Sequence, residues 1–334
     1  MRASVDYASL VAQPSSDAHG QVLAALSSYC FQGVQRLWNP TSGRDDGVTP
    51  SRTAVVIAED ERGRRLCVKF YEDLEEGRRA LQWHATCLAI ARSAVAVPRV
   101  VAVESEAGKL GLPALVTAYV GEPLDHAIFM LSDRARITLA EDIADSLVAL
   151  SRLDLTASGL QMPAKEELHG NVARRFADDA QWHVEHAPAA DANARGPVLH
   201  GARILANAEV AVSAASLCHR DLVGSNITVR NGLFAGFVDW DYAGVDPPEL
   251  DLGSCMLGFL VTIPIPKRER LRLLQVMLTQ YGSQAETMPL LFALDALLDW
   301  TIGGKDAPMD DLIWALSGIA RAIEEEAPLG AVLR

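Results

Sequence analysis

Hydrophobic and polar positions at the start of the chain follow the period of a helix. Apolar residues such as Val22, Leu26 and Val34 recur at helical spacing and predict one amphipathic helix over residues 17–37. The next segment, Asn39–Ser51, is rich in glycine, proline and polar residues and therefore predicts a loop.

The rest of the first third predicts strands around one helix. Residues 53–59 are rich in β-branched types, and residues 65–71 place alternate side chains on opposite faces, so the two segments predict a β-hairpin. The acidic first turn of residues 72–91 predicts a helix, because the helix dipole favours negative charge at its N-terminus. Two further strands follow, joined at Gly108.

Beyond residue 121 the pattern becomes mainly helical. Helices are predicted over residues 130–155, 170–215 and 252–334, with a strand-rich island at 216–240. We therefore expect an α+β protein in three parts: an N-terminal helical extension (1–38), a small strand-rich nucleotide-binding lobe (39–120) and a larger, mainly helical catalytic and substrate-binding lobe (121–334).

Composition and charge exclude several classes of protein. The 334 residues carry 30 Lys and Arg against 43 Asp and Glu, a net charge of −13, which argues against a nucleic-acid partner and suits a cationic one. The longest uncharged apolar stretch, Leu252–Pro266, has 15 residues and two prolines, whereas a membrane helix needs about 20 residues. The five cysteines are scattered, without a CxxC pair, so we expect a cytoplasmic protein.

The most informative segment runs from Leu217 to Asp241. Its Asn231-Gly232 pair is a strong hairpin signal, because a type I′ turn needs positive φ at both central positions. Folding the flanking strands on this turn brings Asn226 and Asp239 to the same open end of the hairpin.

Three polar side chains are therefore expected to converge, since Asp221 lies in the loop that enters the first strand. A carboxylate beside an amide suits Mg²⁺, which prefers oxygen ligands, and a second acid suits proton acceptance from an attacking hydroxyl. Lys69 lies in an apolar strand, where a lysine is unexpected without a function. Together these residue types match the needs of phosphoryl transfer.

These residues resemble a known family. The segment His219-Arg220-Asp221 with Asn226, followed by Asp239 after a hairpin, is similar to the two-lobed protein-kinase-like fold, and most similar to the aminoglycoside phosphotransferase group. The segments that carry the resemblance are, in order along residues 45–260, PSRTAVV, CVKFY, VPRVVAV, LVTAYVGEPL and FVDWDYAGVDPPELDLG.

The resemblance implies a role for each matching residue. Asp221 would orient or deprotonate the acceptor hydroxyl, Asn226 and Asp239 would bind Mg²⁺, and Asp251 would hold the catalytic loop. The implied ATP contacts are Lys69 at the phosphates, Glu76 (with Glu75 as an alternative) as its ion-pair partner, Ser51 in the phosphate-loop strand, and the backbone of Ala118–Val120 at the adenine edge. The acids Asp241, Asp246 and Glu249 are candidates for lining an acceptor site.

Two features depart from the family pattern. Arg220 follows the histidine, where the aminoglycoside group usually has glycine and protein kinases have arginine. The phosphate loop has Gly43 and Gly47 but no GxGxxG.

The main hypothesis is an ATP- and Mg²⁺-dependent phosphotransferase acting on a hydroxyl group of a small polar molecule such as an antibiotic, cationic acceptors included. Arg220 leaves a second enzyme open, a kinase for Ser or Thr of a peptide. The degenerate phosphate loop leaves a third interpretation, a nucleotide-binding pseudokinase scaffold, although the four central polar residues are intact. No nucleic-acid or membrane partner is expected.

Overall fold

The computed structural model describes most of the chain from residue 31 onward. The described residues are 31–38, 54–60, 64–71, 75–105, 113–156, 158–282, 287–303, 307–327 and 329. They divide into two compact units, and the chain passes from the first to the second between Val120 and Gly121. Two short segments are exceptions to this division. Ser93–Ala96 belongs to the second unit, although the residues around it belong to the first, and Asp239–Asp241 belongs to the first unit, although the residues around it belong to the second.

The first unit contains an antiparallel sheet of five strands. In chain order these are β1 (Phe31–Trp38), β2 (Ala54–Asp60), β3 (Arg65–Phe70), β4 (Val100–Glu104) and β5 (Ala114–Ala118). Their spatial order is β1-β2-β3-β5-β4, so β3 is the central strand and Lys69 lies between Val55 and Leu115 of its neighbours. The predicted β2–β3 hairpin and the predicted β4–β5 pair are confirmed.

One prediction for the N-terminal part is wrong. Residues 31–37 were expected to end an amphipathic helix, but Phe31–Trp38 is strand β1, paired antiparallel with β2. Tertiary pairing with β2 overrides the helical spacing of the apolar residues. The rest of the predicted helix, the loop at Asn39–Ser51 and residues 1–30 of the expected extension lie outside the described residues.

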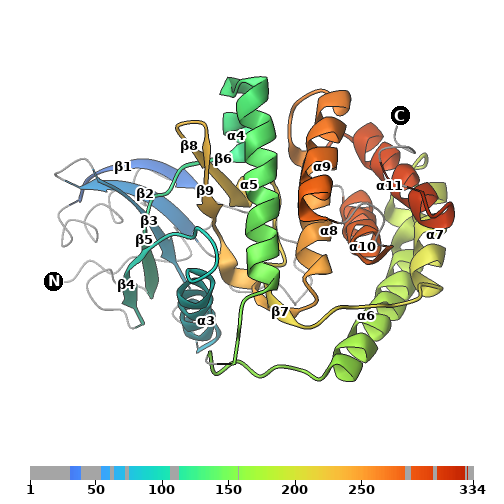
Figure 1. Ribbon diagram of the computed structural model, residues 1–334, viewed down its shortest axis with the longest axis horizontal. Helices are drawn as coiled ribbons and strands as arrows, with labels where there is room; N and C mark the ends of the chain where they lie inside the picture. Colours follow the sequence, from blue (N-terminus) through green and yellow to red (C-terminus); the bar gives the residue numbers. More distant parts are fainter. Residues whose placement is uncertain are drawn as a thin grey trace. The chain divides into compact units, whose positions relative to one another are not determined.

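Helix α3 (Glu75–Ala91) packs against β4 and β5 (Figure 1). Its buried positions recur every three or four residues, which is the spacing of one helix face. They are Gly77, Leu81, His84, Cys87, Leu88 and Ala91. The set is apolar apart from His84, so this side chain needs polar partners within the unit.

The second unit contains two small sheets. β7 (Ser216–Cys218) pairs with β10 (Gly244–Asp246), and β8 (Ile227–Arg230) lies between β6 (Glu122–Pro123) and β9 (Leu233–Phe237). The hairpin predicted from Asn231-Gly232 is confirmed, since both residues have positive φ, 54° and 81°. Short helical turns lie at η1 (Ile128–Met130), η2 (Ala187–Ala189), η3 (Gly224–Asn226), η4 (Trp240–Tyr242, which begins within the first unit) and η5 (Gly258–Thr262).

The remaining predicted helical regions are confirmed except for residues 207–215, which are not helical. The helices are α4 (Leu124–Ala127), α5 (Asp133–Ser151), α6 (Lys165–His186), α7 (Arg195–Ala206), α8 (Glu249–Leu257), α9 (Lys267–Tyr281), α10 (Thr287–Gly303) and α11 (Met309–Glu324). Helix α10 is apolar on nearly every side, and α7, α8 and α11 all contact it. The core of the second unit therefore lies around α10.

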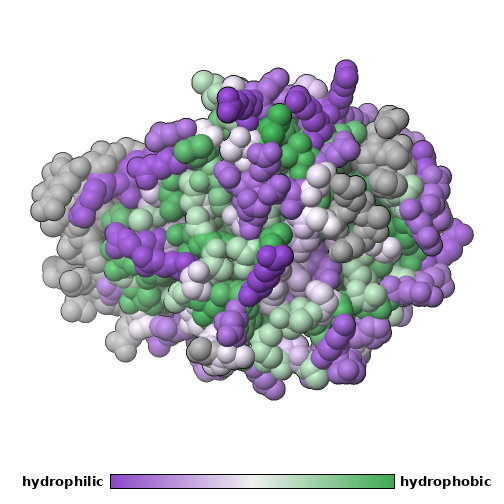
Figure 2. Space-filling view, viewed as in Figure 1, coloured by the Kyte–Doolittle hydropathy of each residue, from purple (hydrophilic) through white to green (hydrophobic). Residues whose placement is uncertain are grey.

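Hydrophilic side chains are spread over the visible face of this helical unit, with hydrophobic ones between them (Figure 2). In the part of the chain that the structure describes, no helix combines the length and the apolar character needed to cross a membrane.

Two helical glycines give a matched test of this packing. A Cβ on Gly253 of α8 would lie 2.7 Å from the carbonyl oxygen of Pro289 in α10, whereas a Cβ on Gly170 of α6 would meet nothing within 4 Å. We expect Gly253→Ala to lower the free energy of unfolding by about 1–3 kcal/mol, because the helix backbones must separate. Gly170→Ala should raise it by about 0.5–1 kcal/mol, because alanine favours the helix. Urea denaturation measures both, and equal effects would contradict the close α8–α10 contact.

Candidate active site

The predicted site residues form two groups, one in each unit. In the first unit Lys69 meets Asp239, and in the second unit Asp221 meets Asn226. The chain itself links the groups, because Asn226 pairs with Val238, the residue before Asp239: the Val238 N–H donates to the carbonyl oxygen of Asn226 at 2.9 Å.

Lys69 is a buried charge with two carboxylate partners. Only 6% of the residue is exposed, and its Nζ lies 2.5 Å from Asp239 Oδ1 and 2.5 Å from Asp241 Oδ2. Burial lowers the pKa of Lys69, but Asp239 and Asp241 outweigh burial and raise that pKa above its ordinary value. The side chain is therefore a fixed ammonium group, as binding to phosphate oxygens requires.

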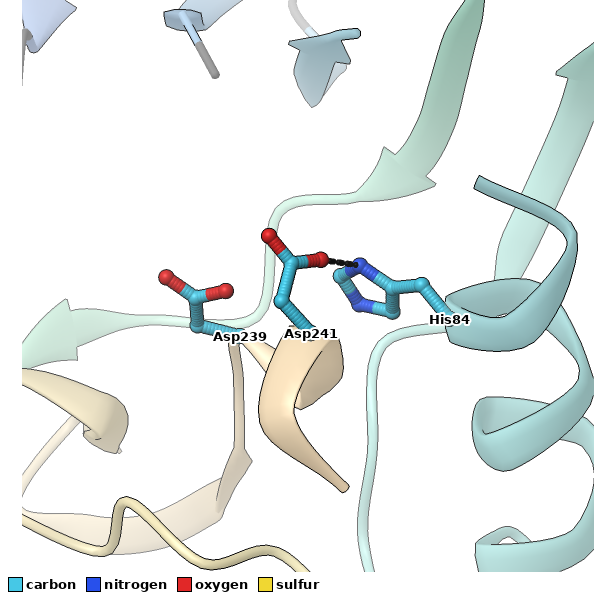
Figure 3. A group of neighbouring side chains, drawn as sticks. All are labelled: His84, Asp239 and Asp241. Carbon is cyan, nitrogen blue, oxygen red and sulfur yellow. Dashed lines mark ion pairs between the residues drawn. The ribbon is translucent and has the colours of Figure 1, made fainter. Parts of the chain in front are cut away.

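Asp241 is the more firmly held of the two acids. Its Oδ1 accepts a hydrogen bond from Tyr71 Oη at 2.9 Å and lies 2.6 Å from His84 Nδ1. Burial alone would raise the pKa of Asp241, but Lys69 and then His84 lower it well below the ordinary value. Figure 3 shows His84 reaching from α3 to the Asp241 carboxylate, with the Asp239 carboxylate beside it.

Asp241 was expected as a candidate for lining an acceptor site, and its burial beside Lys69 contradicts that interpretation. Tyr71 and His84 were not identified from the sequence. Two signals were present: Tyr71 lies two residues after Lys69, on the same side of an extended segment, and His84 is a polar residue on the apolar face of α3.

The predicted ion pair between Lys69 and a helix acid is wrong. Glu76 is exposed in the first turn of α3, and Glu75 is exposed and pairs with Arg79. The register of the helix explains this outcome, because Gly77, Leu81 and His84 take the buried face. Among the described residues, the acids that pair with Lys69 come from the segment Asp239–Asp241 instead.

The other predicted nucleotide contacts stay predictions. Ser51 lies outside the described residues. Ala118 ends β5, and its N–H donates to the carbonyl oxygen of Arg99 at 2.9 Å, so this N–H is already used within the sheet. Val120 follows β5 and is half-buried.

The second group, Asp221 and Asn226, is held by side-chain hydrogen bonds. Asn226 Nδ2 donates to the carbonyl oxygen of Asp221 at 2.8 Å and to its Oδ2 at 2.9 Å. Because the amide nitrogen is committed in this way, Oδ1 is the atom of Asn226 that can bind a cation. Of the three side chains predicted to converge, Asp221 and Asn226 are in contact, whereas Asp239 belongs to the first unit.

Asp251 holds the loop before Asp221, as predicted. Its Oδ2 accepts from the His219 N–H at 2.8 Å and its Oδ1 from the Arg220 N–H at 2.7 Å. Burial raises the pKa of Asp251 to about 7, against the lowering effect of these two hydrogen bonds. His219 is structural, since its Nε2 lies 2.7 Å from the carbonyl oxygen of Val238.

Arg220 has an internal partner. It pairs with Asp246 of β10, and its backbone has a positive φ of 70°, an uncommon conformation for a residue with a side chain. The ion pair therefore accounts for Arg220 within the second unit, and its presence does not by itself point to a peptide acceptor.

The donor atoms of both groups fit a hard cation. Within the described residues, His84, Asp239 and Asp241 offer ligand atoms that lie within 4.8 Å of one another. Asp241 is committed to Lys69 and to α3, but the Asp239 side chain is 37% exposed. Asp239 in the first unit, with its carboxylate oxygens, and Asn226 in the second, with its amide oxygen, each offer the oxygen donor that Mg²⁺ prefers.

Comparisons with known proteins identify the family of the chain. The family model described as "Phosphotransferase enzyme family" matches residues 50–291. A comparison with curated proteins found no match.

Solved structures resemble the whole fold. An ADP-bound aminoglycoside phosphotransferase has a TM-score of 0.56 and 17% identity, covering 92% of this chain and 98% of its own. The macrolide 2'-phosphotransferase apoenzyme from Brachybacterium faecium has a TM-score of 0.54 and 16% identity, covering 93% and 97%. The GDP complex of an aminoglycoside 2'-phosphotransferase mutant has a TM-score of 0.58 and 14% identity, covering 93% and 97%. The predicted α+β, protein-kinase-like fold is confirmed.

Replacing Asp251 tests how the loop is held. An asparagine side chain at this position could accept only one of the two backbone N–H groups and would turn its own N–H₂ toward the other. We expect Asp251→Asn to lower the free energy of unfolding by about 1–3 kcal/mol, the cost of an unsatisfied buried group. Asp178→Asn on the exposed face of α6 should change it by less than about 0.5 kcal/mol. Urea denaturation compares them, and an Asp251→Asn protein as stable as the wild type would contradict this role.

Proposed function

Because this chain belongs to the phosphotransferase enzyme family, we propose that it transfers the γ-phosphoryl group of ATP to a hydroxyl group of a small polar molecule. The observation that carries the proposal is the buried Lys69 ammonium beside Asp239, together with the Asp221–Asn226 pair that precedes Asp239 by one hairpin. Phosphoryl transfer needs a fixed cation, metal ligands and a group that orients the nucleophile, and these residues supply all three.

ATP is the proposed phosphoryl donor. Lys69 would bind phosphate oxygens, and the backbone near Ala118–Val120 would meet the adenine edge. Because the Ala118 N–H is already bonded within the sheet, Val120 would provide the backbone groups for the adenine. Similar solved structures include an ADP-bound aminoglycoside phosphotransferase and a ternary complex with ATP and streptomycin, which supports this choice. GDP occurs in another, so GTP belongs in the same assay.

Mg²⁺ is the proposed metal. Asp239 and Asn226 would hold it, and the ion would neutralise charge on the phosphates that Lys69 also contacts. Asp239 has a positive φ of 65°, a left-handed backbone conformation that is uncommon for a residue other than glycine and is often found at functional sites.

Asp221 would act on the acceptor. The hydroxyl oxygen would form a bond to the γ-phosphorus while the bond from that phosphorus to the β,γ-bridging oxygen breaks, releasing ADP. Asp221 would orient the hydroxyl and accept its proton. The hydrogen bond from Asn226 to Oδ2 keeps this carboxylate in place.

A small antibiotic-like molecule is the proposed acceptor. Similar solved structures are titled as complexes with gentamicin, with streptomycin and with hygromycin B, and the net charge of −13 suits a cationic acceptor. The peptide-kinase alternative was based on Arg220. Because Arg220 forms an ion pair with Asp246, it gives this alternative no specific support. The scaffold alternative conflicts with the intact Lys69, Asp221, Asn226 and Asp239.

A cytoplasmic location stays part of the proposal. Among the described residues, Cys67, Cys218 and Cys255 are free thiols, which suits a reducing compartment.

An acceptor screen tests the proposal directly. ADP release would be measured with ATP or GTP, with and without Mg²⁺, in the presence of aminoglycosides, macrolides or short peptides that contain Ser and Thr. We expect Mg²⁺-dependent ADP release that increases with a small hydroxylated molecule. ADP release that only peptides stimulate would make a peptide hydroxyl the acceptor in place of a small molecule. The absence of nucleotide binding would overturn the function.

Two variants separate chemistry from nucleotide binding. We expect Asp221→Asn, which can still accept the bond from Asn226, to lower turnover by about 10²–10⁴ with Mg·ADP affinity retained, because it cannot take a proton. Asp239→Asn should instead abolish the gain in ADP affinity that Mg²⁺ provides. Steady-state kinetics and calorimetry measure these effects, with Asp178→Asn as the surface control. Full turnover in Asp221→Asn would exclude Asp221 as the catalytic base.

A further inference from the structure

Lys69 has two carboxylate partners with different restraints. The Asp239 side chain is 37% exposed, whereas the Asp241 side chain is 10% exposed and also contacts Tyr71 and His84. If Asp239 turns to a metal ion, Asp241 is the acid that stays with the lysine. The less exposed and more contacted acid is therefore suited to be the permanent counter-charge.

His84 connects this counter-charge to helix α3. Its ring is buried, with 4% of the residue exposed, and both of its nitrogens are engaged. Nδ1 lies 2.6 Å from Asp241 Oδ1 and 2.7 Å from Tyr71 Oη, while Nε2 accepts a hydrogen bond from the Trp240 N–H at 3.3 Å. One side chain from α3 thus contacts two consecutive residues of the segment Asp239–Asp241.

The network assigns the proton on this ring. A nitrogen that accepts a hydrogen bond needs its lone pair, so Nε2 is unprotonated and the ring proton is on Nδ1. From Nδ1 the proton points at the carboxylate of Asp241. The opposite tautomer would set two N–H groups against each other at Trp240 and would leave Nδ1 without a proton to donate to the Asp241 carboxylate, 2.6 Å away.

The geometry points to His84 as the positioning residue for the nucleotide-binding lysine: as the Nδ1–H tautomer it fixes Asp241, and Asp241 fixes Lys69. Helix α3 therefore acts on the lysine through a histidine and a carboxylate of the segment Asp239–Asp241, in place of the direct ion pair expected from Glu76. This inference rests on the proposed function, because it concerns the lysine that would bind the phosphates.

The same network explains why these residues are not a three-ligand metal site. The Lys69 ammonium already lies between the two carboxylates, and His84 Nδ1 carries a proton and cannot donate a lone pair. Of the three side chains, Asp239 alone keeps the exposure that a metal ligand needs.

A matched pair of amides at position 84 tests the inference. The asparagine amide nitrogen takes about the place of Nδ1 and can still donate to Asp241, whereas the glutamine amide reaches about the place of Nε2 and meets Trp240 instead. We expect His84→Asn to bind Mg·ADP within about threefold of the wild type and His84→Gln to bind it about tenfold more weakly, the usual cost of losing a group that orients a ligand-binding residue. His169→Gln on the exposed side of α6 is the surface control.

Calorimetry with Mg·ADP gives the affinities, and thermal unfolding of each variant shows whether it is folded. Long-range ¹H–¹⁵N spectra of the wild-type protein, labelled in histidine, report the tautomer independently of any variant; the His84 signal is assigned by its loss in His84→Asn. A protonated Nδ1 with an unprotonated Nε2 supports the inference, and the opposite tautomer overturns it.

The outcomes also distinguish this inference from the proposed function. A wild-type protein that does not bind Mg·ADP would overturn the function itself. If the wild type binds Mg·ADP and Asp239→Asn loses its response to Mg²⁺, the function stands. Under those conditions, equal affinities for His84→Asn and His84→Gln would overturn the role of His84.

Discussion

A buried ammonium group in the central strand of a sheet is the constraint on which the candidate site depends. Removing such a charge from water costs several kcal/mol unless opposite charges and hydrogen bonds surround it. The first unit meets this requirement by including three residues, Asp239–Asp241, that the chain reaches only after passing through much of the second unit. The electrostatic need of Lys69 thus ties the central strand to a segment 170 positions further along the chain.

The two acids in this segment have separate tasks. Asp241 is buried and held by donors on β3 and α3, so it neutralises the lysine permanently. Asp239 is more exposed, so it is the acid to which the proposed function gives the metal ion.

In the second unit, too, a buried carboxylate is surrounded by hydrogen-bond donors, and here it holds the loop before Asp221. Asp251 is buried and accepts hydrogen bonds from two consecutive backbone N–H groups, which fixes the residues just before Asp221. His219 and Arg220 then contact Val238 and Asp246. These contacts satisfy polar groups of the loop inside the unit and hold the residues just before Asp221, the residue that the proposed function assigns to the acceptor.

Short-range features were determined by the sequence itself. The Asn231-Gly232 turn follows from the backbone angles that these residues tolerate. Lys69 could be recognised as a candidate site residue because a lysine in an apolar strand is costly to bury. Tertiary structure decided the rest. Residues 31–38 became a strand through pairing with β2. The partners of Lys69 are Asp239 and Asp241 from a distant segment, and α3 reaches this cluster through His84 on its buried face rather than through Glu76. The physical reason is the same in both cases: a local pattern specifies which conformations and charges a segment can offer, but burial against distant residues selects among them.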